Sequence, residues 1–366
     1  MINQKHAKQD AELQKPIGEN HGKYTGEMHT PFGKLLMTKF FGKLFLIITL
    51  VCLIFSAYMN SRAFEILTGS AMPSLVIGVL YVTFGILSVM QDSIMHKCRN
   101  RKFEMCMGFI TCFFIYDFLI LLVWEILKTI FSAAGMLNAA GTFISDAAAV
   151  LTVALGYQHA KQLRCTSYSI DIGLHQPCRI ALLSDIHLGA YVGAAHVRKI
   201  VDMVNRLNGD AVVICGDLID VNNHILADKK VLDEISSIFR EMNSREGVYV
   251  VLGNHDPKAD NESFQEFLKD SHIQLLDNRA VRLSCFNLVG RTNAAHNLRQ
   301  PIEFFSGKID QAVPTVVLDH DPNSIPEAVS FGADLVLCGH THVLPSNHLH
   351  QNGKWETLLL WLREVS

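Results

Sequence analysis

The sequence predicts a mixed α/β domain that follows an N-terminal bundle of transmembrane helices. The first half of the 366-residue chain contains long, nearly uncharged apolar stretches, which are typical of helices that cross a bilayer. From about residue 178, short aliphatic runs alternate with amphipathic helical patterns, as in layered α/β folds. The net charge of −3 does not indicate a nucleic-acid binder.

The N-terminal half divides into a tail and a membrane region. Residues 1–33 are polar and show no apolar period, so we expect a solvated tail. Residues 34–160 are expected to hold three to four transmembrane helices, at about 40–58, 71–90, 107–127 and 141–157. The last stretch is shorter and rich in alanine, so it is the weakest candidate for a membrane-crossing helix. A soluble helical core is the less favoured alternative, because several long apolar stretches follow one another.

Charged loops predict the orientation of this integral membrane protein. Basic residues lie before or at the start of the first stretch and in the loop between the second and third, namely Lys34, Lys39, Lys43, Lys97, Arg99, Arg101 and Lys102. Because basic loops stay on the cytoplasmic side, four crossings place residues 161–366 in the cytoplasm. With only three crossings, the C-terminal domain would lie on the opposite face.

One acid lies in the middle of the third apolar stretch. Asp117 is costly to bury in a membrane, so it marks either a functional site or a contact with a neighbouring helix. The helix contact is the favoured interpretation.

The elements of the C-terminal half follow from their hydrophobic periods. Strands are predicted at 179–184, 211–215, 247–252, 281–289, 315–318 and 334–338, and helices at 195–207, 229–242 and 263–269. The apolar tail at 355–362 is expected to form one strand or helix.

Polar residues of the kinds that bind metals follow five of these strands. They are Asp185 and His187; Asp217 and Asp220 in Gly-Asp-x-x-Asp; Asn254, His255 and Asp256 in Gly-Asn-His-Asp; His320; and His340 and His342 in Gly-His-Thr-His. Strand ends meet at one edge of an α/β sheet, so we expect these groups to converge. Carboxylates and imidazoles together suit two divalent cations of the Mn, Fe or Zn type. The glycines that precede Asp217, Asn254 and His340 are expected to let the backbone turn sharply.

This set of motifs resembles the calcineurin-like metallophosphoesterases, in particular their membrane-anchored branch. The resemblance covers residues 185–342 and implies a four-layered α/β/β/α sandwich, with residues 161–366 as the metallophosphoesterase domain. The chain departs from the family after His342, where Gly-Gly-Gln is replaced by Val343-Leu344-Pro345-Ser346. From this departure we expect a C-terminally truncated second sheet.

The resemblance also implies a role for each site residue. One metal would be held by Asp185, His187 and His342, the other by Asn254, His320 and His340, with Asp217 bridging the two. His255 would be the acid at the leaving-group oxygen, supported by Asp220 or Asp256. Arg291, which follows the strand predicted at 281–289, is a less favoured candidate for a phosphate contact.

These roles predict a metal-dependent phosphoric-ester hydrolase. Two cations can clamp phosphate oxygens and lower the pKa of a bridging water, so that a metal-bridging hydroxide attacks phosphorus. The expected substrate is a phosphodiester or pyrophosphate, lipid-linked or nucleotide, because a membrane anchor brings the domain close to lipids. The alternative is a non-catalytic membrane sensor or scaffold that only binds phosphorylated ligands. The presence of His255 argues against it, since a binding module has little need for a leaving-group acid.

Overall fold

The computed structural model describes residues 31–89, 101–130, 137–220, 225–294, 298–340 and 357–364. The chain divides into two compact units, Met1–Val51 and Cys52–Ser366. Most of the predicted polar tail lies outside the described residues, and so does the predicted metal ligand His342.

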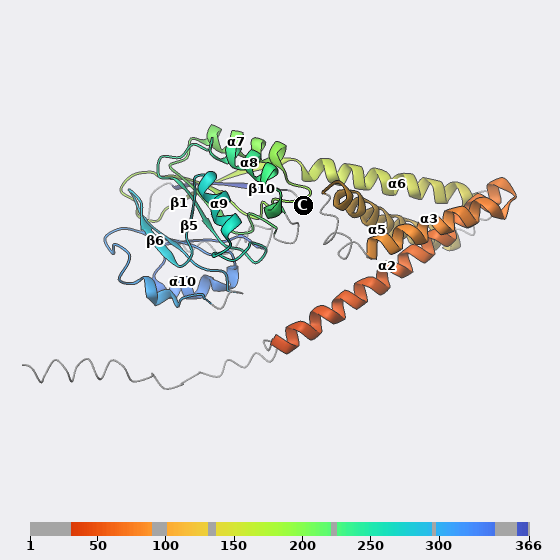
Figure 1. Ribbon diagram of the computed structural model, residues 1–366, viewed down its shortest axis with the longest axis horizontal. Helices are drawn as coiled ribbons and strands as arrows, with labels where there is room; N and C mark the ends of the chain where they lie inside the picture. The colour runs from red at the N-terminus through yellow and green to blue at the C-terminus, as the bar shows by residue number, and fades with distance from the viewer. Residues whose placement is uncertain are drawn as a thin grey trace, which may run out of the picture. The chain divides into compact units, whose positions relative to one another are not determined.

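Long helices form the N-terminal half (Figure 1). They are α2 (Pro31–Thr68), α3 (Ala71–Val89), α5 (Arg101–Ile130) and α6 (Leu137–Ala160). Among the described residues, the segments Leu50–Thr68, Arg101–Ile130 and Ala140–Ala160 are long and apolar enough to cross a membrane, whereas α3 supplies a shorter apolar segment, Leu75–Leu87. The stretch expected to be weakest, 141–157, thus belongs to one of the three long segments.

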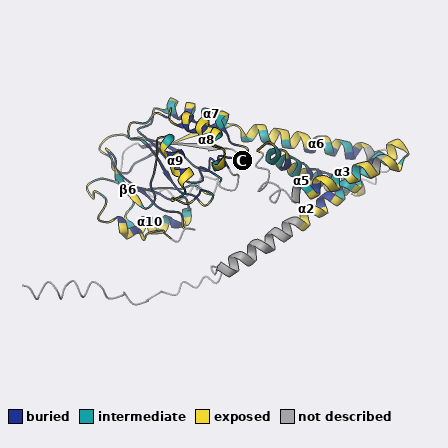
Figure 2. Ribbon diagram, viewed as in Figure 1, coloured by how far each residue is buried: buried dark blue, intermediate teal, exposed yellow. Residues whose placement is uncertain are grey.

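The helices pack through aromatic contacts and expose apolar side chains on their outer faces. Ring centroids lie 5.4 Å apart for Phe55 and Phe118 and 5.1 Å apart for Phe64 and Phe143, which joins α2 to α5 and α6. Aliphatic residues such as Val79 and Leu151 are exposed. Exposed residues, drawn in yellow in Figure 2, are frequent on α3 and α6. Exposed apolar surface of this extent is costly in water and favourable in lipid.

Two β-sheets form the C-terminal domain. The first has the order β1-β10-β2-β3-β4-β5 and the second the order β6-β7-β8-β9. The strands are β1 (Leu163–Ile170), β2 (Arg179–Leu183), β3 (Ala211–Cys215), β4 (Val248–Val251), β5 (Ile273–Leu275), β6 (Arg279–Arg282), β7 (Asn287–Gly290), β8 (Thr315–Leu318), β9 (Leu335–Leu337) and β10 (Thr357–Glu364). The pairs β1–β10 and β6–β7 are antiparallel, and the remaining pairs are parallel.

The period-two alternation of the strands divides their side chains between layers. In β2, Ala181 and Leu183 pack under helices α7 (Ala194–Leu207), α8 (Lys229–Phe239) and α9 (Glu262–Asp270). The alternate residue Leu182 joins Leu288 and Val316 in a core between the two sheets.

On the second sheet, Val317 faces outward against Ala328 of α10 (Ile325–Phe331) and Phe305 of the 3₁₀ helix η3 (Ile302–Phe305). The four-layered α/β/β/α arrangement is therefore confirmed.

The structure differs from the sequence prediction in a few elements. The strand predicted at 281–289 is a hairpin of β6 and β7, closed by a bond from the Leu283 N–H to the Phe286 carbonyl of 2.9 Å. The sequence pattern did not reveal the turn, because apolar residues lie on both sides of it.

Strands β1 and β5 and helix α10 were not predicted. Strand β1 is mostly exposed, and β5 and α10 are only three and seven residues long. The C-terminal apolar tail forms β10, which lies between β1 and β2 in the first sheet.

Candidate metal and catalytic site

The predicted ligands gather where parallel strands of both sheets end. Asp185 and His187 follow β2, Asp217 follows β3, and His320 and His340 follow β8 and β9. Potential ligand atoms lie within 4.8 Å of one another in the group Asp185, His187, Asp217 and in the group Asp217, His320, His340. The Asp217 carboxylate is common to both groups, so the two half-sites share one ligand.

Asp217 is the centre of the arrangement. Asp217 is 2% exposed, and its Oδ2 lies 3.2 Å from His320 Nε2 and 3.7 Å from His187 Nε2. The other oxygen, Oδ1, accepts the His255 backbone N–H at 2.8 Å. Burial opposes ionisation, but the hydrogen bond and charge of His320, the His255 N–H and the charge of His187 together lower the pKa of Asp217. The carboxylate is therefore held in its anionic form.

His320 is fully buried and fixed in orientation. Its Nδ1 lies 2.7 Å from the Cys215 carbonyl oxygen, so Nδ1 carries the proton and Nε2 points to Asp217 and to Asn254 Oδ1, at 3.1 Å. Burial alone would lower the pKa of His320, but the hydrogen bond and charge of Asp217 outweigh it and raise the pKa to about 9. The surroundings of Nε2 therefore favour positive charge, which a bound cation would supply in place of a proton.

Asp185 joins the ends of two strands from different sheets. The Ser184 hydroxyl donates to Asp185 Oδ2 at 2.6 Å, and the His340 backbone N–H donates to Oδ1 and Oδ2 at 3.2 and 3.1 Å. The side chain of Ser184 also reaches the Cys215 carbonyl at 3.2 Å. The sequence pattern gave no reason to single out Ser184, because a serine before an acid is common.

The backbone of the site is unusual at the predicted ligands. Among the described residues other than glycine, positive φ angles include 53° at Asp185, 50° at His187, 52° at Asp217 and 70° at His340. Such angles carry a steric cost that the surrounding structure must offset, and they are concentrated at functional sites.

Two of the glycines expected to open the turns serve different purposes. Gly216 has a φ of +85°, as expected for a sharp turn. A Cβ at Gly253 would instead collide with the Asp217 carboxyl group. Glycine is therefore required at position 253 so that the backbone can lie close to the Asp217 carboxyl group.

Of the two carboxylates expected to support His255, Asp220 lies beside it. His255 Nδ1 is 3.7 Å from Asp220 Oδ1, and these two residues form a third ligand group with His187. Asp256 is 4% exposed and accepts the backbone N–H groups of Ile219 and Gly253, both at 2.8 Å. Burial raises the pKa of Asp256 to about 7 despite these two bonds. Asp256 thus fixes two motif loops to each other.

The donor set fits divalent cations. Carboxylate oxygens, imidazole nitrogens and the Asn254 amide oxygen converge from separate strands, as borderline metals such as Mn, Fe and Zn require. The buried partners of His320 and Asp185 are the outer contacts that commonly orient metal ligands.

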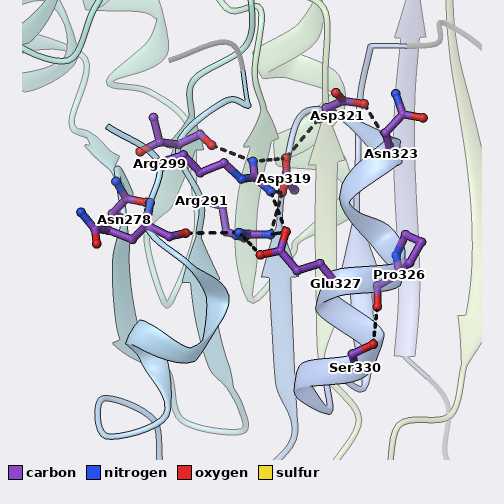
Figure 3. Close-up of polar contacts among 11 residues, drawn as sticks. Asn278, Arg291, Arg299, Asp319, Asp321, Asn323, Pro326, Glu327 and Ser330 are labelled. Atoms are coloured by element: carbon purple, nitrogen blue, oxygen red, sulfur yellow. Dashed lines mark hydrogen bonds and ion pairs between the residues drawn. The ribbon is translucent and has the colours of Figure 1, made fainter. Parts of the chain in front are cut away.

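A buried ion-pair network supports the loop that carries His320 (Figure 3). The Asp319 carboxylate, 0% exposed, accepts from Arg299 Nη2 at 2.6 Å and Nη1 at 3.2 Å, and it lies 3.6 Å from Arg291 Nη1. Arg291 is bound by both oxygens of Glu327, at 2.8 and 2.9 Å. With 1% of its side chain exposed, Arg291 is a structural residue, and the less favoured phosphate contact was wrong. No sequence motif marked Arg299, and Asp319, which directly precedes His320 at the fourth strand end, was given no role.

Comparisons with known proteins agree with this geometry. Residues 178–344 match the family model described as Calcineurin-like phosphoesterase. A Helicobacter pylori protein named Uncharacterized metallophosphoesterase is 33% identical over 177 residues, which cover 46% of this chain and 45% of that protein. A Danio rerio protein named Transmembrane protein with metallophosphoesterase domain is 35% identical over 180 residues, covering 45% of this chain and 40% of the relative.

A third relative has a named activity. UDP-2,3-diacylglucosamine pyrophosphatase LpxG of Chlamydia muridarum is 24% identical over 213 residues, covering 45% of this chain and 63% of that protein. The matched part of the chain thus spans less than half the length of the first two relatives.

Proposed function

We propose that this chain, whose residues 178–344 form a calcineurin-like phosphoesterase domain, is a membrane-bound, metal-dependent phosphoric-ester hydrolase. The observation that carries the proposal is the Asp217 carboxylate, which lies in two ligand groups at once. A shared carboxylate between two half-sites supports a pair of divalent cations. Asp185, His187 and His342 would hold one, and Asn254, His320 and His340 the other.

When bound, such cations supply Lewis acidity to a phosphate ester and acidify a coordinated water. The protein's own groups prepare the site for them. The lowered pKa of Asp217 keeps its carboxylate ionised, and the Cys215 carbonyl holds His320 with Nε2 directed inward. Because contacts within the protein fix these orientations, little reorganisation is needed for binding.

His255 is the proposed proton donor to the leaving-group oxygen. Its side chain is 41% exposed, so it can reach a substrate, while its backbone N–H is bound to Asp217. Asp220, 3.7 Å from His255 Nδ1, would orient the ring toward the leaving-group oxygen. Asp256 would keep the loop of His255 in register with the loop of Asp217, through its bonds to Ile219 and Gly253.

The proposed substrate is a phosphodiester or pyrophosphate of a lipid-linked molecule or a nucleotide. The apolar helices support a membrane location, and a relative is named as a transmembrane protein with the same domain. A distant relative is named as a pyrophosphatase of a diacylated nucleotide sugar. A membrane-bound hydrolase meets lipid-linked substrates at a high local concentration.

The proposed orientation places the catalytic domain in the cytoplasm, with four crossings. The basic loop before and at the start of α5 supports this side. Protease treatment of sealed vesicles of known orientation would test it. Protection of the domain in inside-out vesicles would contradict the cytoplasmic assignment.

An assay of the full-length protein in detergent on bis-p-nitrophenyl phosphate with Mn²⁺ tests the hydrolase. We expect metal-dependent turnover, and a loss of about 10³-fold in the Asp217→Ala variant, since metal charge stabilisation is worth several kcal/mol. Glu241→Ala is the matched control, because Glu241 pairs with Arg198 on the surface, where such pairs contribute little. No turnover by the unmutated protein, with retained binding of phosphate, would favour the scaffold alternative.

A further inference from the structure

A cluster of polar residues lies inside the helical bundle, one or two from each helix. The membrane cluster, as we call it, consists of Ser56 and Asn60 on α2, Tyr81 on α3, Asp117 on α5 and Asp146 on α6. The Asn60 side-chain nitrogen donates to the Tyr81 hydroxyl at 2.9 Å, to Asp146 Oδ1 at 3.3 Å and to the Ser56 carbonyl at 3.2 Å. One amide therefore joins three of the helices.

Two members of the cluster have buried side-chain oxygens that lack a well-formed hydrogen bond. Ser56 and Asp117 are both 0% exposed. Among the residues that the structure describes, neither carboxyl oxygen of Asp117 nor the Ser56 hydroxyl makes a hydrogen bond of normal length and angle. Buried polar atoms in native proteins are nearly always satisfied, so these atoms call for a ligand.

The Asp117 carboxyl group has the Asp146 carboxyl group and Ser56 as direct neighbours. Two ionised carboxylates are both acceptors and cannot bond to each other. A contact between them is stable only when a proton or a metal cation lies between the oxygens, as in other carboxylate pairs that share a site.

The charges of the cluster lead to the same requirement. The titratable groups that face Asp117 from the described parts of the other helices are Asp146 on α6 and Tyr81 on α3, and α2 contributes the uncharged Ser56 and Asn60. Among the described residues, the groups that act on the two acids are each other, Ser56 and Asn60, and none of these carries a positive charge. Uncompensated negative charge inside a membrane is expensive, so positive charge must come from a bound species.

We propose that the membrane cluster is a cation site that holds one exchangeable positive charge, a proton or a sodium ion, between Asp117 and Asp146. Both ions have the same requirement for carboxylate oxygens, and the hydroxyls of Ser56 and Tyr81 add further oxygen ligands, which hard cations prefer. The site is independent of the proposed phosphoesterase activity.

Thermal unfolding of the full-length protein in nanodiscs distinguishes the two ions. If sodium binds, replacing choline by Na⁺ at constant ionic strength should raise Tm by about 3–5 °C per tenfold increase above the dissociation constant. If a proton binds, Tm should instead fall as pH rises, because the folded state then holds more protons than the unfolded state.

Asparagine variants test the role of the acid pair. In Asp117→Asn, the new amide can donate directly to Asp146, so the bound cation is no longer needed and the dependence should disappear. Glu125→Gln on the same helix is the matched control, because Glu125 pairs with Lys128 outside the cluster, and it should keep the dependence of the unmutated protein. A dependence that survives in both Asp117→Asn and Asp146→Asn would overturn the proposal.

A second measurement on the unmutated protein covers the case in which the asparagine variants fail to fold. If the bound ion is a proton, infrared spectra should show a protonated carboxyl group whose signal is lost at high pH. If it is sodium, radioactive sodium should bind at about one ion per chain, as the single site requires. Absence of both signals would overturn the cation site.

Discussion

Replacing Asp319 by alanine should destabilise the α/β domain strongly and weaken metal binding next to it. The variant removes a fully buried carboxylate that accepts two bonds from Arg299, at 2.6 and 3.2 Å, and the Asp321 backbone N–H at 3.2 Å. It also removes a partner of Arg291, whose Nη1 lies 3.6 Å from Asp319 Oδ2 and whose side chain is 1% exposed (Figure 3). The loss leaves positive charge buried without its main counter-ion.

The magnitude follows from burial and from the partners that remain. Breaking a buried ion pair by deleting one member costs about 3–5 kcal/mol. Arg291 keeps both oxygens of Glu327, and Arg299 is 14% exposed and lies 3.7 Å from Glu327, so we expect the lower end of that range. A loss of about 3 kcal/mol corresponds to a fall in Tm of about 6–12 °C for a domain of this size.

Scanning calorimetry of the full-length protein in nanodiscs measures this change. Glu327→Ala should cost less, about 1–2 kcal/mol, because Glu327 is 44% exposed and its loss leaves Arg291 paired with Asp319. The exposed pair of Arg198 and Glu241 supplies the control Glu241→Ala, with little change expected. A fall in Tm for Asp319→Ala no larger than for the control would refute the inferred network.

Three further predictions concern the active site. Gly253→Ala should lower kcat about 100-fold with little change in KM, because its Cβ would displace the Asp217 carboxyl group; full activity would contradict the close approach. His255→Gln should lower the rate about 10²–10⁴-fold on an alkyl phosphodiester and much less on a p-nitrophenyl ester, whose leaving group needs no proton; equal losses on both would rule out a leaving-group acid. Chelation by EDTA should abolish hydrolysis, and added Mn²⁺, Fe²⁺ or Zn²⁺ should restore it; activity that persists after exhaustive chelation would exclude a metal-dependent reaction.

Much of the fold could be predicted from the sequence because its strongest signals are local. The strand at Ala211–Cys215 is a short aliphatic run between turn residues, which is typical of a strand buried on both faces, and all of its residues are buried. The helix Ala194–Leu207 follows from an apolar face at helical spacing. The hairpin within 279–290 was missed, because apolar residues lie on both sides of the turn and do not show where the chain reverses.

The candidate site, like the fold, could be predicted only in part from the sequence. Metal-binding residue types in five ordered motifs predicted which strand ends carry ligands, and the structure brings Asp185, His187, Asp217, His320 and His340 together as expected, with His342 outside the described residues. The choice between Asp220 and Asp256 as the partner of His255 could not be made from spacing. Both are near His255 in the motifs, and only the directions of their side chains separate them.

By itself, therefore, the sequence determined the order of membrane helices, strands and ligand-bearing loops, since each depends on residues a few positions apart. The tertiary structure alone decided the pairings between distant segments: Asp319 with Arg299 and Arg291, and the Ser184 hydroxyl with the Cys215 carbonyl. It also placed Asp117 against Asp146 on another helix. Such contacts depend on how whole elements pack, because the free energy of a buried charge depends on which partner the fold brings to it.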